Sequence, residues 1–205
     1  MDPVIEPFWS GVRVLAHLGP AAEPEPDPVV RLMIDGEADL ALELSEVAAQ
    51  VAASVDAIEA VVDGVVTRQV GLPGVGAAPI AEVRGSASAI LMRNTADIDF
   101  VPRGVPTDAG SAAEGFVAVD LLSVDGTDLL DVPLLERKRL LESVVRQSDR
   151  VRLSAVARPP IDTWVATWKA LGLRGGLLKA ANSRYEPGAR SAAWRIVERV
   201  GRQGA

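Results

Sequence analysis

The chain has 205 residues, enough for one hydrophobic core with a small appendage, and it contains no cysteine and a single histidine, His17. That composition excludes a disulfide scaffold, a cysteine nucleophile and thiolate metal sites, and it leaves almost no material for a Ser-His-Asp triad or a histidine-based metal site. Averaged over the chain, the net charge of −7 is not that of a nucleic-acid binder.

The chain has no uncharged apolar run of about 18 residues, which predicts that no segment spans a membrane. Its start, Met1-Asp2-Pro3-Val4-Ile5-Glu6, is acidic and lacks the basic region of a signal peptide. A cytoplasmic protein without a membrane anchor is therefore expected.

β-Branched runs predict several short strands, and periodic apolar residues predict three helices. In chain order the predicted strands are residues 12–15, 29–34, 60–66, 90–92, 98–101, 116–122, 151–156, 175–178 and 194–200. The predicted helices span residues 45–53, with Ser45 as N-cap, 131–148, and 161–171. Residues 19–28, 71–79 and 102–110 are rich in proline and glycine and are predicted loops. Because strands and helices do not alternate regularly, the pattern favours an α+β fold with largely antiparallel sheets.

Charge is distributed unevenly along the chain. Residues 151–205 hold ten basic and three acidic side chains, whereas residues 1–150 carry a net charge of −14. This split is consistent with a basic face formed by the C-terminal part, and equally with two parts that neutralise each other inside one fold. The pair Trp164 and Trp168, four residues apart on a predicted helix, is interpreted as core packing.

Four segments together resemble the nucleotidyltransferase (adenylation) domain of ATP-dependent DNA ligases. Residues 6–13 read EPFWSGVR and are similar to the nucleophile motif EPKWDGxR, and residues 60–66 (AVVDGVV) resemble the strand VLDGExV. Residues 116–145 resemble FDLLxxDGxDL followed by PLxxRRxxL. Residues 172–194 (GLRGGLLKAANSRYEPGARSAAW) resemble GLEGVxxK followed by SxYxPGxRSxxW.

The resemblance implies an ATP-grasp-like α+β adenylation domain with mostly antiparallel sheets flanked by helices. It covers residues 1–205 as one degenerate domain, with a divergent stretch at 67–115. The oligonucleotide-binding-fold domain that follows in the family is not expected, because only about eleven residues remain after Trp194.

Ligases of this family attack the α-phosphate of ATP with a lysine and use carboxylates for ribose and magnesium. Here Phe8 stands at the lysine position. Ser10, Val65 and Arg174 replace three motif acids, Val119 replaces the aromatic that would stack on adenine, and Val197 replaces a lysine. The resemblance therefore predicts no catalytic residue and no metal site.

The positions that remain available for a nucleotide are Trp9, Arg13, Lys179 and Arg195, and those available for nucleic acid are Arg184 and Arg190. Lys138 and Lys169 are not expected to replace the nucleophile. The first hypothesis is a ligase-like pseudoenzyme that binds DNA or a DNA-repair protein and needs no cofactor. The alternatives are an ATP-binding sensor and an active nucleotidyltransferase that uses other residues, with ATP and magnesium as its ligands.

Overall fold

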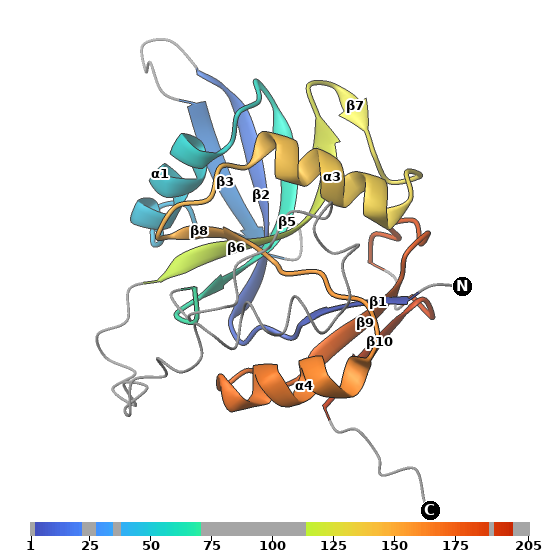
Figure 1. Ribbon diagram of the computed structural model, residues 1–205. Helices are drawn as coiled ribbons and strands as arrows, with labels where there is room; N and C mark the ends of the chain where they lie inside the picture. The colour runs from blue at the N-terminus through green and yellow to red at the C-terminus, as the bar shows by residue number, and fades with distance from the viewer. Residues whose placement is uncertain (1–2, 22–27, 35–37, 71–113, 189–190, 199–205) are drawn as a thin grey trace, which may run out of the picture.

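The computed structural model describes residues 3–21, 28–34, 38–70, 114–188 and 191–198, which form two sheets and three helices (Figure 1). The larger sheet has the order β4-β3-β2-β5-β6-β7, with β8 paired to β6. Its strands are β2 (Val12–Ala21), β3 (Pro28–Ile34), β4 (Ala38–Asp39), β5 (Ala60–Thr67), β6 (Gly115–Val124), β7 (Thr127–Asp128) and β8 (Val151–Leu153). The smaller sheet has the order β1-β9-β10, with β1 (Pro3–Pro7), β9 (Gly176–Ala180) and β10 (Trp194–Val197). Every strand pair in both sheets is antiparallel except β6 with β8, which confirms the predicted α+β class.

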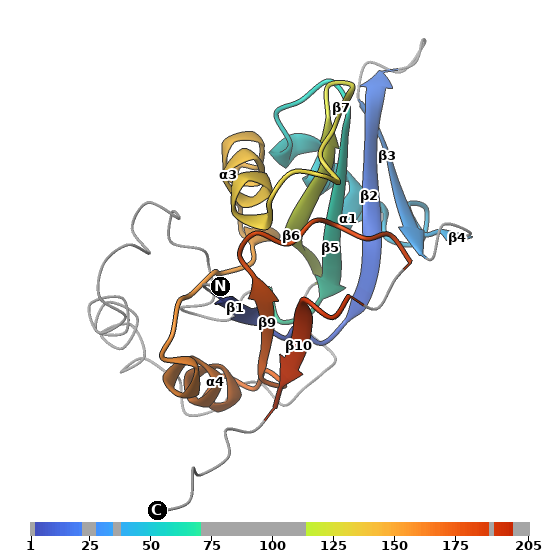
Figure 2. The same cartoon turned by 90° about the vertical axis from the view of Figure 1, so that its right-hand side faces the viewer.

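The helices α1 (Ser45–Ser54) and α3 (Leu134–Val144) cover one face of the larger sheet (Figures 1 and 2). Alternate residues of a strand point to opposite faces, and on β5 the buried Val62 and Val66 point toward these helices. They share one core with Val51 of α1 and Leu141 of α3. The residues between them on β5, Asp63 and Val65, consequently face the opposite side of the sheet.

The helix α4 (Ile161–Ala170) packs on the smaller sheet, at the bottom of Figure 1. Trp164 and Trp168 are buried there, with ring centroids 5.8 Å apart, and they form a second core with Ile5 of β1. The interpretation of this pair as core packing is confirmed. None of the described helices combines the length and apolar character needed to cross a bilayer.

Several predicted boundaries are wrong, two of them because strand pairing outweighs the local pattern. The N-cap of α1 is Leu44, and Ser45 is the first helical residue, with no side-chain cap. The predicted loop at 19–28 is too long at both ends, because β2 continues to Ala21 and β3 begins at Pro28. The helix predicted over 131–148 ends at Val144, since Val145 leaves it to form an isolated β-bridge with Val55.

All seven predicted strands that fall on described residues differ in length from the observed strands, and three observed strands, β1, β4 and β7, were not predicted. β8 stops at Leu153, β9 runs from Gly176 to Ala180, and β10 ends at Val197. The strand β1 escaped prediction because prolines stand at both of its ends, although proline is tolerated on edge strands such as this one. The predicted strands 90–92 and 98–101 and the loops 71–79 and 102–110 lie outside the described residues.

Candidate functional site

A cavity of about 1090 Å³ lies between the smaller sheet and the face of the larger sheet that is turned away from α1 and α3. The larger sheet contributes Arg13 of β2, Asp63 and Val65 of β5, and Val119 of β6. The rest of the wall comes from the end of β1 and the chain that follows it, from the chain before β9, from β9 and β10, and from the segment that joins these two strands. These lining residues are Glu6, Pro7, Phe8, Trp9, Ser10, Gly11, Arg174, Leu177, Lys179, Tyr185, Glu186, Gly188, Ser191, Trp194, Arg195 and Ile196.

The loop between β1 and β2 holds Phe8, Trp9 and Ser10 at the cavity, and its backbone is fixed from both sides. The Phe8 N–H donates to the Gly175 carbonyl at 2.9 Å, and the Ser10 carbonyl accepts from Thr67 Oγ1 at 2.6 Å. Gly11 has a φ of 154°, and a Cβ there would lie 2.2 Å from the Val66 carbonyl oxygen, so only glycine fits this turn. The loop is therefore tied to both sheets.

The Arg174 guanidinium lies over the ring of Phe8, with 4.7 Å between its Cζ and the ring centroid. Gly175, the next residue, has a φ of 150°, and a Cβ there would meet the Val197 carbonyl oxygen at 2.4 Å. This close approach brings the chain before β9 against β10, where Arg174 also donates to Glu198 at 3.1 Å. A cation thus stacks on an aromatic ring at the mouth of the cavity.

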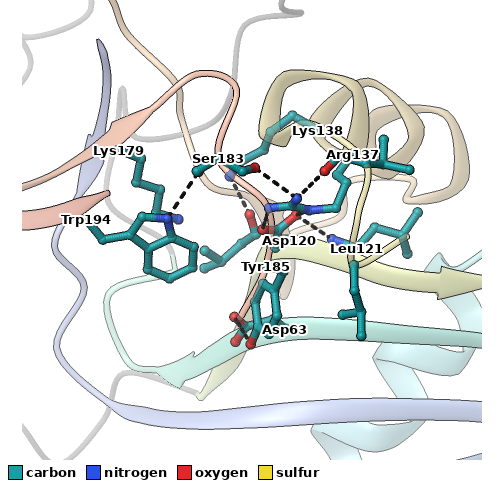
Figure 3. A network of polar contacts seen from close by, with 12 residues as sticks. Asp63, Asp120, Leu121, Arg137, Lys138, Lys179, Ser183, Tyr185 and Trp194 are labelled. Carbon is teal, nitrogen blue, oxygen red and sulfur yellow. Dashed lines mark hydrogen bonds and ion pairs between the residues drawn. The ribbon is translucent and has the colours of Figure 1, made fainter. Parts of the chain in front are cut away.

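Two lysines share one carboxylate at the base of the cavity. Glu6 Oε1 lies 2.9 Å from Lys138 Nζ and 3.1 Å from Lys179 Nζ, and at most 3% of any of these three side chains is exposed. Lys138 also donates to the Val119 carbonyl, and burial lowers the pKa of Lys138 below its ordinary value. Lys179 Nζ makes no hydrogen bond and lies 4.3 Å from the ring centroid of Trp194, beside which it stands in Figure 3.

Asp63 is held by a cation and a phenol on the cavity wall. Arg13 donates to both of its carboxylate oxygens, at 2.9 and 2.6 Å, and the Tyr185 hydroxyl donates to Oδ2 at 3.1 Å. The hydrogen bonds with Asp63 raise the pKa of Arg13, and burial raises the pKa of Tyr185. The carboxylate is 2% exposed, so its negative charge is already neutralised within the wall.

A second buried ion pair, Asp120 with Arg137, lies behind the cavity and contributes no lining atom. The guanidinium donates to both carboxylate oxygens at 2.9 and 2.8 Å and to the Ser183 carbonyl at 3.2 Å (Figure 3). The Ser183 hydroxyl in turn accepts from Trp194 Nε1 at 3.3 Å. This pair joins β6 and α3 to the segment between β9 and β10, so the role of Asp120 is to hold these elements together.

Comparison of this chain with known proteins supports the resemblance seen in its sequence. The family model described as "ATP dependent DNA ligase domain" matches residues 95–195. A probable DNA ligase of Streptomyces avermitilis is 38% identical over 100 residues, which make up 47% of this chain and 20% of that protein. The chain thus resembles the adenylation domain of ATP-dependent DNA ligases.

Solved structures agree on the fold. The ligase domain of LigD from M. tuberculosis superposes with a TM-score of 0.60 at 23% identity, over 94% of this chain and 52% of that chain. A mycobacterial DNA ligase D complexed with ATP and MES superposes with a TM-score of 0.59 at 21% identity, over 94% of this chain and 53% of that one. The chain spans about a fifth of the length of the curated relative and about half of these ligase structures.

The fold brings most of the motif positions of this ligase-like domain together at the cavity. Phe8, Ser10, Val65, Val119 and Arg174 all line it, and Val197 does not. All four positions named for a nucleotide also line it: Trp9, Arg13, Lys179 and Arg195. Trp9, however, is 7% exposed and donates from Nε1 to Ser154 Oγ at 3.1 Å, so its polar atom is used in the fold.

Of the two arginines assigned to a nucleic-acid face, the structure describes Arg184, which does not line the cavity. Arg184 lies on the surface and donates to Asp131 at 3.0 Å, with 70% and 87% of these side chains exposed. Such an exposed pair contributes little stability and opens easily. Arg190 lies outside the described residues.

Glu6 and Lys138 were missed as members of the site. Lys138 lies four residues after Leu134 and three before Leu141, both buried, so its spacing on α3 already placed it on the apolar face. A lysine at such a position needs a buried anion, and Glu6 supplies it. Lys138 itself does not line the cavity, and that it does not replace the nucleophile stays a prediction.

The magnesium ion that ligase chemistry uses does not fit the carboxylates of this cavity. Glu6 is shared by two ammonium groups, and Asp63 is paired with Arg13. The third lining carboxylate, Glu186, is exposed, so holding a divalent cation with more than this one group would require breaking these buried pairs. The described residues also contain no group of three or more His, Cys, Asp or Glu side chains arranged to hold a metal.

Proposed function

We propose that this ligase-like domain is catalytically inactive and acts as a binding module. The observation that carries the proposal is Phe8, which stands at the position of the nucleophilic lysine and packs its ring against Arg174. A phenyl ring has no lone pair with which to attack a phosphate, so no covalent nucleotide adduct can form at this residue.

The other amines of the chain are no substitute. Its three lysines are Lys138, Lys169 and Lys179, and only Lys179 lines the cavity. Lys179 Nζ is fully buried against Glu6 and under the Trp194 ring. An ammonium group in an ion pair has no free electron pair, which supports the assignment of a non-catalytic role.

The partner that we propose is DNA or a protein of DNA repair, in the cytoplasm. The support is the relationship to DNA ligases and the basic character of residues 151–205. An ATP-binding sensor is the second candidate, and it is favoured by the retained cavity with Arg174, Lys179 and Arg195 on its wall. An active nucleotidyltransferase that works through residues outside the usual motifs is the third and has the least support.

The test of inactivity is incubation with α-labelled ATP and magnesium, followed by denaturation and electrophoresis. We expect no label on the wild-type protein. The matched variant Phe8→Lys restores only the amine, and we expect it to stay unlabelled as well, because Arg174 and Val65 leave the reacting phosphates without a metal site. Label retained on denatured wild-type protein would show that the domain is an active nucleotidyltransferase.

A further inference from the structure

The wall of the cavity has more positive charge than its own carboxylates can neutralise. Four cations line it, Arg13, Arg174, Lys179 and Arg195, against Glu6, Asp63 and Glu186. Arg13 and Asp63 neutralise each other in a bidentate pair. The remaining cations are therefore opposed by Glu6, which Lys179 shares with Lys138, and by two exposed carboxylates, Glu186 of the wall and Glu198, the partner of Arg174.

Glu6 cannot satisfy both of its partners. Lys138 and Lys179 both contact its Oε1 atom, and the contact with the fully buried Lys179 Nζ lacks hydrogen-bond geometry. The charge of Lys179 is therefore only partly neutralised, and a further anion nearby lowers its free energy. Lys179 is among the lining residues but lies under the Trp194 ring, so an anion in the cavity acts on this charge through space without touching Nζ.

Arg174 supplies a second cation at the same cavity, in the place where the resemblance leads one to expect a glutamate. Its guanidinium is oriented by the Phe8 ring, and its competing partner Glu198 is 52% exposed. An exposed pair of this kind is weak and can exchange one carboxylate for another anion. Guanidinium groups bind phosphate oxygens through paired hydrogen bonds, and they carry their charge without a metal.

We infer that the cavity binds a polyphosphate chain without a divalent cation, with Arg174 and Lys179 providing the charge that magnesium would otherwise supply. Arg195 lies beside Trp194, the ladder partner of Lys179, and adds a third positive charge to the same wall. The inference rests on the proposed function, because it assigns a ligand class to a non-catalytic cavity. The shared chemistry is a linear chain of phosphates, either free or as the tail of a nucleoside triphosphate.

The test is isothermal titration calorimetry of the whole chain with sodium tripolyphosphate, once in EDTA and once in excess magnesium. We expect binding in EDTA that is at least as tight as in magnesium, since the metal competes with the protein for the phosphates. Arg174→Glu restores the acid and is expected to weaken binding in EDTA about tenfold or more. The control Arg139→Glu makes the same charge change on the exposed side of α3 and should stay within about twofold.

Parallel titrations with ATP and adenosine distinguish the sources of the phosphate chain. Binding of tripolyphosphate and ATP without binding of adenosine supports the inference. Three results would overturn it: binding that requires magnesium, an equal loss in the Arg174→Glu and Arg139→Glu variants, or binding of adenosine without tripolyphosphate. None of these measures a covalent adduct, so the labelling experiment above can fail or succeed independently.

Discussion

Replacing Glu6 by glutamine should destabilise the domain far more than removing one of its two lysine partners. All three side chains are buried, and both ammonium groups contact the same oxygen, at 2.9 and 3.1 Å. Their nitrogen atoms are thus about 6 Å apart at most, where two unit charges repel by about 3 kcal/mol at an effective dielectric constant of about 20. Glu6 is the group that offsets this repulsion.

The expected magnitudes follow from the charge left behind. Glu6→Gln leaves two buried cations without an anion, and removing one partner of a buried pair costs about 3–5 kcal/mol. For a chain of this size that lowers the Tm by about 6–20 °C. Lys138→Met leaves the Glu6–Lys179 pair matched and places an apolar side chain in a buried site, so its change should stay within about 2 kcal/mol.

The assay is urea denaturation followed by tryptophan fluorescence, with thermal melts as a second measurement. The double variant Glu6→Gln with Lys138→Met closes the cycle and should be more stable than Glu6→Gln alone, because one of the two unpaired cations is gone. Two results would contradict the electrostatic explanation of this cluster: a Lys138→Met variant as unstable as Glu6→Gln, or a double variant no more stable than Glu6→Gln.

Three further results are expected. Because burial lowers the pKa of Lys138, the unfolded state binds more protons than the folded state as the pH rises toward the ordinary lysine value of 10.5. The stability of wild type relative to Lys138→Met should therefore increase from about pH 8 to pH 10 in urea titrations; a flat difference would contradict the lowered pKa. Tyr185→Phe removes the hydrogen bond that the hydroxyl donates to Asp63 and the one that it accepts from Arg13, and it should cost about 1 kcal/mol in the same assay. No change would mean that water replaces the hydroxyl. Duplex DNA binding is expected to be weak and to be lost as salt rises, and Arg184→Glu should weaken it further. The control Arg31→Glu alters another surface ion pair, Arg31 with Asp39, and should leave DNA binding unchanged. Equal effects of the two variants would refute the assigned face.

The predicted fold class was correct because the larger sheet has a helix-covered face and its strands carry β-branched residues at alternating positions. The ends of elements were less predictable. Leu44 precedes α1 as an N-cap without any capping side chain, and Val145 ends α3 by pairing with Val55, ninety residues earlier in the chain. The first boundary lacks the capping side chain by which a helix start is recognised in a sequence. The second depends on a bridge to a distant segment, which leaves no signal in the residues around Val145.

The sequence predicted which residues line the site better than it predicted the contacts between them. The motif positions Phe8, Val119 and Arg174 were found in the sequence, and the fold brings them to one cavity. What the sequence did not reveal is that the acids that remain are already used. Glu6 lies between two lysines because β1 pairs with β9, which carries Lys179, and α3 brings Lys138 to the same carboxylate. Asp63 is bound by Arg13 because β5 pairs with β2.

Both explanations given for the uneven charge of the chain apply, each to different residues: part of the basic charge is neutralised inside the fold, and part remains at a surface. Some C-terminal cations neutralise acids of the first 150 residues, as Lys179 does with Glu6 and Arg184 with Asp131. Others, such as Arg174 and Arg195, line the cavity, where the acids that a ligase needs for metal have been replaced. A cavity that loses its metal-binding carboxylates loses with them the repulsion that kept bare phosphates out. On the proposed function, the substitutions that would prevent adenylyl transfer also favour binding of an uncomplexed polyanion, and for this reason the two properties are expected to occur together.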